Sequence, residues 1–207
     1  MASDAQTRVY DRHEAVVFRV TTGEFGGLSN MAANFPLEIN CTQIATVEAL
    51  YQACRFPDRP DVQALIVGQL SPMTAKMKSK RFRKSTRDDW HKVRVKIMRW
   101  CLRVKLAQNW SSFSALLRKT GARPIVEESR RDVFWGAKPQ ENGTLVGMNV
   151  LGRLLMELRQ DLQPETKDAL RVIAPPKIPN FLFLGKGIDA VGPRGTESAQ
   201  FQPSMFG

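Results

Sequence analysis

The stretch "TRDDWHKVRVKIMRWCLRVKLAQN", residues 86–109, is the longest helical pattern in the sequence. Its apolar residues recur at steps of three and four, which places them on one face of an α-helix. These residues are Trp90, Val93, Ile97, Cys101 and Val104. Lys92, Arg99 and Arg103 lie largely off that face. The pattern therefore predicts a core helix whose outer surface carries basic residues.

Shorter patterns lie on both sides of this helix. Further helices are predicted at residues 46–56, 59–70, 71–82, 111–121 and 149–162. Strands are predicted at residues 15–20, 35–39, 124–129 and 132–136. Because helices dominate and the strands are few and short, we expect the α+β class: a helix-rich single domain with a small sheet.

The composition limits the cellular setting. No window approaches the roughly 18 to 20 apolar residues that span a bilayer, and the first residues lack the apolar core of a signal peptide. We therefore expect a cytoplasmic protein with no membrane partner. The three cysteines are widely scattered and there are two histidines, so the sequence predicts no metal site and no cofactor.

The net charge of +11 is concentrated in one segment. Residues 76–105 hold 13 Lys and Arg against two Asp, while the rest of the chain has 18 residues of each sign. A basic segment on a neutral body is typical of a protein that binds a polyanion. A solvated helix face is the alternative, but the segment contains no Glu to alternate with the basic residues.

One candidate site residue is Glu48, in the first turn of the helix predicted at 46–56. Glu48, Gln52 and Arg55 share one face, so a polar strip runs along a helix that should otherwise be buried. The alternative is that Glu48 only interacts favourably with the helix dipole.

A second candidate is Asp132, which precedes Phe134 and Trp135. Aromatic neighbours exclude water and can tune the pKa of a carboxyl group. A solvated turn or a salt bridge is the alternative for Asp132. Trp90 begins the basic helix, where its ring is either part of the core or a stacking surface for a nucleobase.

Two glycine-rich loops, "GEFGGLSN" (23–30) and "GTLVGMN" (143–149), precede predicted elements. Neither has the pattern of a Rossmann or P-loop nucleotide site. Glycine still lets backbone N–H groups approach a phosphate closely, and a helix that starts at Asn149 offers such groups.

Several motifs together carry a family resemblance. They are "FGGLSNMAANFPL", "TVEALYQACRF", "SPMTAKMKSK", "DVFWG" and "GMNVLGRLLMELR". In order and spacing they resemble the NADAR (YbiA-like) family over residues 15–162. The sequence departs from the family at "VEALYQ", where Glu48 is kept but a histidine that often follows it is absent.

The resemblance implies a helix-rich α+β fold and N-glycosidase chemistry without a metal or cofactor. It places a NADAR-like catalytic domain at 15–165, which leaves an N-terminal extension at 1–14. The resemblance says nothing about residues 166–207, and the change in sequence character beyond Pro175 predicts a partly mobile C-terminal extension there. Glu48 and Asp132 correspond to the family's catalytic carboxylates and Trp90 to its stacking tryptophan. The sequence leaves open which of the two carboxylates is the acid, the base or the group that stabilises charge. It also leaves open a Schiff-base route through Lys76 or Lys78.

The expected binding residues fall into two sets. Those for the substrate are Trp90, Trp135, Gly136, Ser29, Asn30, Asn149, Gln52 and Arg55. Those for nucleic acid are Lys76, Lys78, Lys80, Arg81 and Arg83.

The basic segment favours one substrate class among those that the resemblance implies. The leading hypothesis is hydrolysis of ADP-ribose from guanine in single-stranded DNA, which would reverse a cognate DNA ADP-ribosyltransferase toxin. The alternatives are a riboflavin-pathway N-glycosidase acting on phosphorylated pyrimidine intermediates, and a non-catalytic module that binds ADP-ribose or nucleic acid.

Overall fold

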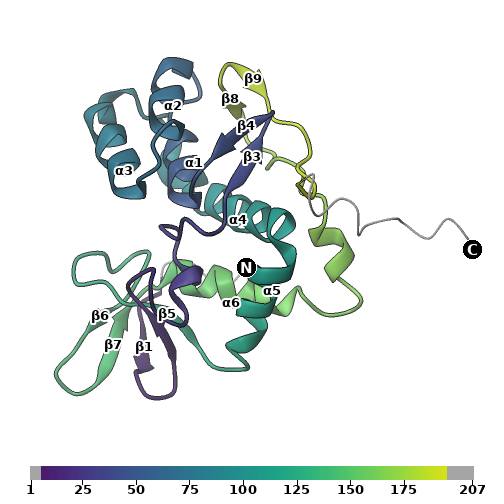
Figure 1. The fold of residues 1–207 in the computed structure, drawn as a ribbon. Helices are drawn as coiled ribbons and strands as arrows, with labels where there is room; N and C mark the ends of the chain where they lie inside the picture. Colours follow the sequence, from purple (N-terminus) through teal and green to yellow (C-terminus); the bar gives the residue numbers. More distant parts are fainter. Residues whose placement is uncertain (1–5, 195–207) are drawn as a thin grey trace, which may run out of the picture.

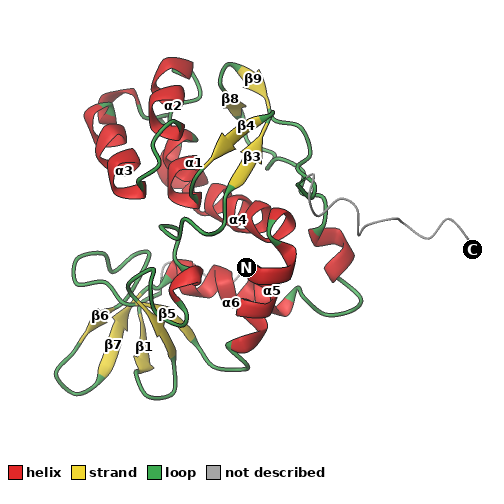
Figure 2. Cartoon of the chain, in the orientation of Figure 1, coloured by secondary structure: helices red, strands yellow, loops and turns green. Residues whose placement is uncertain are grey.

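A computed structural model describes residues 6–194 of the chain (Figures 1 and 2). In this range the α-helices are α1 (Val47–Ala53), α2 (Pro60–Val67), α3 (Pro72–Arg81), α4 (Trp90–Gln108), α5 (Trp110–Lys119) and α6 (Val150–Gln160). The 3-10 helices are η1 (Gly26–Leu28), η2 (Arg83–Ser85) and η3 (Lys167–Leu170). The strands are β1 (Arg8–Asp11), β2 (Val16–Phe18), β3 (Leu37–Ile39), β4 (Thr42–Ile44), β5 (Ile125–Glu127), β6 (Lys138–Pro139), β7 (Thr144–Gly147), β8 (Leu182–Phe183) and β9 (Lys186–Gly187).

Helix α4 is the centre of the fold, as the sequence predicts. It lies between the α1–α3 group and the α5–α6 group (Figure 1) and contacts α1, α5 and α6. The five apolar residues that its pattern placed on one face are all buried. The α+β, helix-rich expectation is confirmed, because short strands pair around this helical core.

The strands form small separate sheets. β1, β7 and β6 make an antiparallel sheet in that order, and β2 pairs with β5 in parallel. β3 pairs with β4, and β8 pairs with β9. Figure 2 shows β1, β5, β6 and β7 gathered on one side of the helices, away from β3, β4, β8 and β9. The β2–β5 pair directs the end of β5 towards α1 and α4.

The segment 132–136 is a turn, and its expected assignment as a strand is wrong. The Oδ1 atom of Asp132 accepts hydrogen bonds from the backbone N–H groups of Phe134 and Trp135, at 3.0 and 2.9 Å. The carbonyl groups of 133–136 then accept hydrogen bonds from the N–H groups of 148–151. The segment therefore pairs with the beginning of α6 instead of with a strand.

The predicted long helix begins four residues later than its pattern suggested, at Trp90. Thr86 does not cap it: its Oγ1 accepts a hydrogen bond from Nη2 of Arg55 at 3.3 Å. Asp89 forms an ion pair with Arg87, whose Nε lies 2.5 Å from Oδ1 of Asp89. The side chains of Thr86 and Asp89 therefore contact Arg55 and Arg87 instead of the backbone N–H groups in the first turn of α4.

Both expected extensions contain ordered elements. β1 lies within residues 1–14 and completes the sheet with β7. Within 166–207, the described part contains η3 and the β8–β9 hairpin, and Phe183 is buried in the core. Gln63 of α2 holds this hairpin through hydrogen bonds with the Leu182 carbonyl (2.9 Å) and the Leu184 N–H (2.6 Å). Residues 195–207, also expected to be mobile, lie outside the described part.

Across residues 6–194, none of the helices combines the length and the apolar character that a bilayer span requires.

Candidate active site

A cavity of about 730 Å³ opens where α1, α3, the start of α4, the end of β5 and the turn before α6 meet. Its volume is in the usual range for a small-molecule site. The sequence-predicted residues that line it are Ser29, Asn30, Glu48, Gln52, Arg55, Lys76, Arg83, Trp90, Asp132 and Trp135. The predicted residues that lie outside its lining are Lys78, Lys80, Arg81, Gly136 and Asn149.

Glu48 enters the cavity from the first turn of α1. Thr46 begins the helix, because its Oγ1 accepts a hydrogen bond from the Ala49 N–H at 3.2 Å. The backbone N–H of Glu48 donates to the Asn30 carbonyl at 3.0 Å, which ties the glycine-rich loop to α1. The Glu48 side chain is buried although it lines the cavity. A buried carboxylate needs compensating partners.

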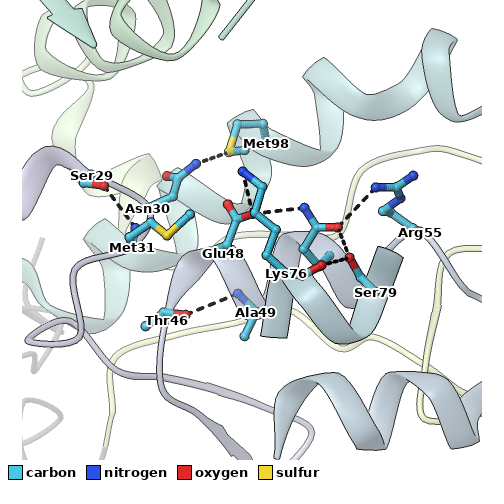
Figure 3. Close-up of polar contacts among 11 residues, drawn as sticks. Ser29, Asn30, Met31, Thr46, Glu48, Ala49, Arg55, Lys76, Ser79 and Met98 are labelled. Atoms are coloured by element: carbon cyan, nitrogen blue, oxygen red, sulfur yellow. Dashed lines mark hydrogen bonds and ion pairs between the residues drawn. The ribbon is translucent and has the colours of Figure 1, made fainter. Parts of the chain in front are cut away.

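A chain of polar contacts supplies those partners (Figure 3). Nε2 of Gln52 donates to Oε1 of Glu48 at 3.0 Å, and Nζ of Lys76 lies 3.7 Å from the same oxygen. Oε1 of Gln52 in turn accepts from Oγ of Ser79 at 2.7 Å and from Nη1 of Arg55 at 3.2 Å. The polar strip that the sequence predicted on this helix is therefore a connected network between α1 and α3.

Ser29 and Asn30 are positioned by a lysine that the sequence analysis did not single out. Lys105 of α4 is fully buried, and its Nζ donates to the carbonyl groups of Gly27 (2.6 Å) and Ser29 (3.2 Å). The ring of Phe35 lies 4.5 Å from Nζ. Burial lowers the pKa of Lys105 to about 7. Even the neutral amine keeps two N–H donors for the two carbonyls.

Aromatic rings form one wall of the cavity. Tyr51 lies between Trp90 and Trp135, with ring centroids 5.1 and 5.6 Å away. Trp90 is only 6% exposed and the Arg55 guanidinium lies 5.1 Å from its ring centroid, so Trp90 is a wall of the cavity and not an open stacking platform. Burial, with a contribution from Glu48, raises the pKa of Tyr51 and keeps its hydroxyl protonated.

Asp132 lies at the exposed end of the cavity. Its side chain is held by the two backbone donors of the turn, and its own N–H donates to Oγ of Ser129 at 3.0 Å. Two donors on one oxygen fix the rotamer of the carboxylate. Asp132 therefore faces the cavity from a rigid turn.

A third carboxyl group, Glu127, lines the same cavity and was missed by the sequence analysis. It is the last residue of β5 and is partly buried. Burial raises its pKa to about 7, and the negative charges of Asp132 and Glu48 add to that shift, while Lys76 opposes it. The protonated form of Glu127 is therefore favoured to a higher pH than is usual for a glutamate.

Asn149 and Gly136 have structural positions behind Glu127. The buried side chain of Asn149 accepts the Glu127 N–H at 3.1 Å and donates to the Ile125 carbonyl at 2.8 Å. A Cβ atom on Gly136 would lie 2.5 Å from the Glu127 carbonyl oxygen, so only glycine permits this approach. Because the N–H groups of 148–151 are bonded to the turn, they are not directed at a phosphate as the sequence analysis expected.

The basic segment 76–105 is not one continuous charged surface. Arg99 pairs with Glu157 of α6 and Arg103 with Asp161, the residue that follows α6, and Lys105 is in the core. The basic residues of this segment that line the cavity are Lys76, Arg83, Arg87 and Arg94. The basic residues of α3 and η2 that lie outside the cavity lining are Lys78, Lys80, Arg81 and Lys84. The exposed cations outside the cavity lining therefore include those of α3 and η2 as well as Lys92 and Lys96 of α4.

Three buried polar atoms of cavity-lining residues have no hydrogen-bond partner within residues 6–194. They are Oδ1 of Asn30, Nε of Arg55 and Nε of Arg94. Most buried polar atoms in native proteins are satisfied, so this concentration at one site indicates a polar ligand. In the same part of the chain, no cluster of His, Cys, Asp and Glu has the arrangement of a metal site.

The chain is similar to known proteins over most of its length. The NADAR domain family matches residues 17–163. The N-glycosidase YbiA of Escherichia coli (strain K12) is 34% identical over 151 residues, which cover 72% of this chain and 88% of that protein. An N-glycosidase of Nostoc punctiforme is 31% identical over 141 residues, covering 67% and 86%. A riboflavin biosynthesis protein of Vibrio vulnificus (strain YJ016) is 35% identical over 116 residues, covering 56% and 30%.

The fold is likewise similar to a solved structure. The NMR structure of E. coli YbiA has a TM-score of 0.62 at 31% sequence identity, with 75% of this chain and 89% of that chain covered. The family match spans well over half of the chain, and it includes the cavity residues from Ser29 to Leu151. The chain therefore belongs to the NADAR domain family, whose members similar to it include N-glycosidases.

Proposed function

We propose that this protein is an N-glycosidase that hydrolyses ADP-ribose from guanine bases in DNA. The observation that carries the reaction class is the meeting of Glu48, Glu127 and Asp132 with an aromatic wall in one cavity. The names of the relatives, two of them N-glycosidases, support the same class.

The chemistry suits these groups. Breaking a C1′–N bond develops positive charge on the ribose, and a carboxylate beside C1′ stabilises that charge. A carboxylate can also orient and deprotonate the attacking water. Glu48 and Asp132 are the candidates, because each is held in place at the cavity by defined hydrogen bonds. The rings of Tyr51 and Trp135 also line the cavity and would limit access of water to a bound sugar.

DNA as the substrate is supported by the cations around the cavity. Lys76 and Arg83 line it, and the basic residues of α3 and η2 continue outward from it. A polyanion that follows these residues would reach the cavity with its phosphates neutralised. The cavity itself would take the extruded ADP-ribosyl base. This proposal implies a cognate DNA ADP-ribosyltransferase that makes the substrate.

A second candidate has its own supporting observation. Relatives from Vibrio vulnificus and Zea mays are named riboflavin biosynthesis proteins. A phosphorylated pyrimidine ribose intermediate would need two or three cations, and Arg55, Lys76 and Arg94 line the cavity. The matched segment spans only 30% and 19% of those two proteins. A non-catalytic module that binds ADP-ribose or nucleic acid is the third candidate.

One experiment separates the three candidates. The protein is incubated with a single-stranded oligonucleotide ADP-ribosylated on guanine, and in parallel with the pyrimidine ribose-phosphate, and product release is followed by chromatography. We expect release of ADP-ribose, and loss of about 10²- to 10⁴-fold in rate for Glu48→Gln and Asp132→Asn. Turnover of the pyrimidine alone would assign the riboflavin-type reaction. Binding without turnover of either, unchanged in both variants, would assign the module.

A further inference from the structure

The backbone of Glu127 is held on several sides at the wall of the cavity. Its N–H donates to Oδ1 of Asn149 at 3.1 Å, and its carbonyl accepts from the Ala137 N–H at 2.8 Å. Phe18 of β2 is its parallel-strand partner, and Gly136 packs against its carbonyl oxygen. Three other segments, at Phe18, at Gly136–Ala137 and at Asn149, thus fix the backbone from which this side chain enters the cavity.

The neighbours of the Glu127 side chain differ from those of the other two carboxyl groups. Glu48 faces the Lys76 ammonium and an amide donor, and Asp132 faces two backbone N–H donors. Such partners favour a carboxylate. The charged groups that act on Glu127 are Asp132, Glu48 and Lys76, two of them negative.

The other charged or titratable side chains that line the cavity are Tyr51, Arg55, Arg83, Arg87, Asp88, His91 and Arg94. Burial and the negative neighbours together keep a proton on Glu127 near neutral pH, where its pKa lies.

We propose that Glu127 is a third catalytic carboxyl group, the acid that protonates the leaving nitrogen of the base. This assignment rests on the proposed N-glycosidase function and deepens it. It gives the cavity one carboxyl group that donates a proton and two that serve as carboxylates, a division of roles that carboxyl groups in different environments commonly show in glycosidases.

The step balances as a hydrolysis. The C1′–N bond breaks and its electron pair leaves with nitrogen, while the oxygen of water forms a bond to C1′. Glu127 transfers its proton to the leaving nitrogen, and Glu48 or Asp132 accepts the proton that water loses. Exchange with solvent then restores the starting protonation of both groups. A nitrogen of a nucleobase amine is a poor leaving group unless it is protonated, so the acid is required.

The test compares Glu127→Gln with wild type, Glu48→Gln and the matched control Glu141→Gln. Glu141 is an exposed residue of the β6–β7 turn, so the same substitution there should leave activity unchanged. The rate constant kcat/KM is measured from pH 5 to pH 9 on the ADP-ribosylated oligonucleotide and on the pyrimidine ribose-phosphate. Thermal melting confirms that each variant is folded.

We expect the wild-type rate to fall as pH rises through about 7, because the acid loses its proton. Glu127→Gln should lose about 10²- to 10⁴-fold at pH 6 and should lose this alkaline limb. Glu48→Gln should be slow but keep the limb. A folded Glu127→Gln within threefold of wild type, or with the limb intact, would overturn the assignment alone. Absence of wild-type turnover on both substrates would overturn the proposed function, and this assignment with it.

Discussion

Nζ of Lys76 lies 3.7 Å from Oε1 of Glu48, so α3 supplies the countercharge for the buried carboxylate of α1. The same two helices are joined by the hydrogen bond from Ser79 to Gln52. The position of the charge on α3 therefore sets the electrostatic environment of the proposed catalytic carboxylate.

Replacement of Lys76 tests this pairing and also the Schiff-base route. Lys76→Met should lower kcat/KM about 10- to 100-fold, because Glu48 is left buried without its cation. Lys76→Arg keeps the charge and should stay within about tenfold of wild type. Lys138→Met is the control, since Lys138 is an exposed lysine of β6 outside the cavity lining.

The two routes give opposite results for Lys76→Arg. An arginine cannot form a Schiff base, so complete inactivity of this variant, with borohydride trapping of substrate on the wild-type protein, would establish the covalent route. Activity near wild type in Lys76→Met would show that the ion pair contributes nothing to the reaction.

Lys105→Met should destabilise the fold. The carbonyl groups of Gly27 and Ser29 would lose their shared donor inside the core, at a cost of about 2–4 kcal/mol in the free energy of unfolding. Urea denaturation measures this loss. Because Ser29 lines the cavity, the variant should also bind substrate more weakly. Unchanged stability would mean that the methionine side chain compensates by packing.

The difference in free energy of unfolding between wild type and Lys105→Met should depend on pH. The folded pKa of Lys105 is lowered to about 7, against an ordinary value of 10.5. Between these values the unfolded chain binds more protons than the folded one, so wild-type stability gains from this group as pH rises. The stability difference between wild type and Lys105→Met should therefore widen from pH 7 to pH 10. A difference that is constant over this range would contradict the lowered pKa.

Glu127→Gln should stabilise the fold at alkaline pH. The folded pKa of Glu127 is raised from 4.5 to about 7, so the folded state binds more protons between these values and wild-type stability falls as pH rises through them. Glu127→Gln cannot ionise at this position, so its stability does not fall in this way. At pH 8 its free energy of unfolding should exceed that of wild type by about 1–3 kcal/mol, and this difference should vanish near pH 4.5. Equal stability at both pH values would count against a raised pKa.

The basic residues of α3 should determine the salt dependence of DNA binding. Replacing Lys78, Lys80 and Arg81 by Ser should reduce the slope of log Kobs against log salt by about 2, since each phosphate contact on a single strand contributes about 0.7. The control is Arg99→Gln with Arg103→Gln, because these cations are already paired with Glu157 and Asp161. An equal reduction in both variants would show that DNA does not follow α3 in particular.

The sequence by itself determined the family, the helical core and about half of the residues that line the cavity. Apolar spacing identified the buried face of α4, since that signal is local and repeats over five turns. Glu48, Gln52 and Arg55 were found because one helix carries all three on one face. Local patterns of this kind survive folding unchanged.

Only the tertiary structure placed Glu127 at the cavity. Its neighbour Glu128 is the same residue type, but Glu128 pairs with Arg12 and Arg19, whereas Glu127 lines the cavity. Successive strand residues point to opposite faces, and which face meets α1 depends on how β5 pairs with β2 and packs on α6. The sequence of a three-residue strand is too short to indicate which of its faces will meet α1.

The same reason explains Lys105 and Asn149. In sequence, Lys105 is one of 13 basic residues, and the position of its Nζ is set by the carbonyls of a loop some 76 residues earlier. Asn149 resembles a helix cap, yet it supports β5 from behind because the turn at 132–136 occupies the N–H groups at the start of α6. Hydrogen-bond partners that are distant in sequence are chosen by packing, so the tertiary structure alone assigned them.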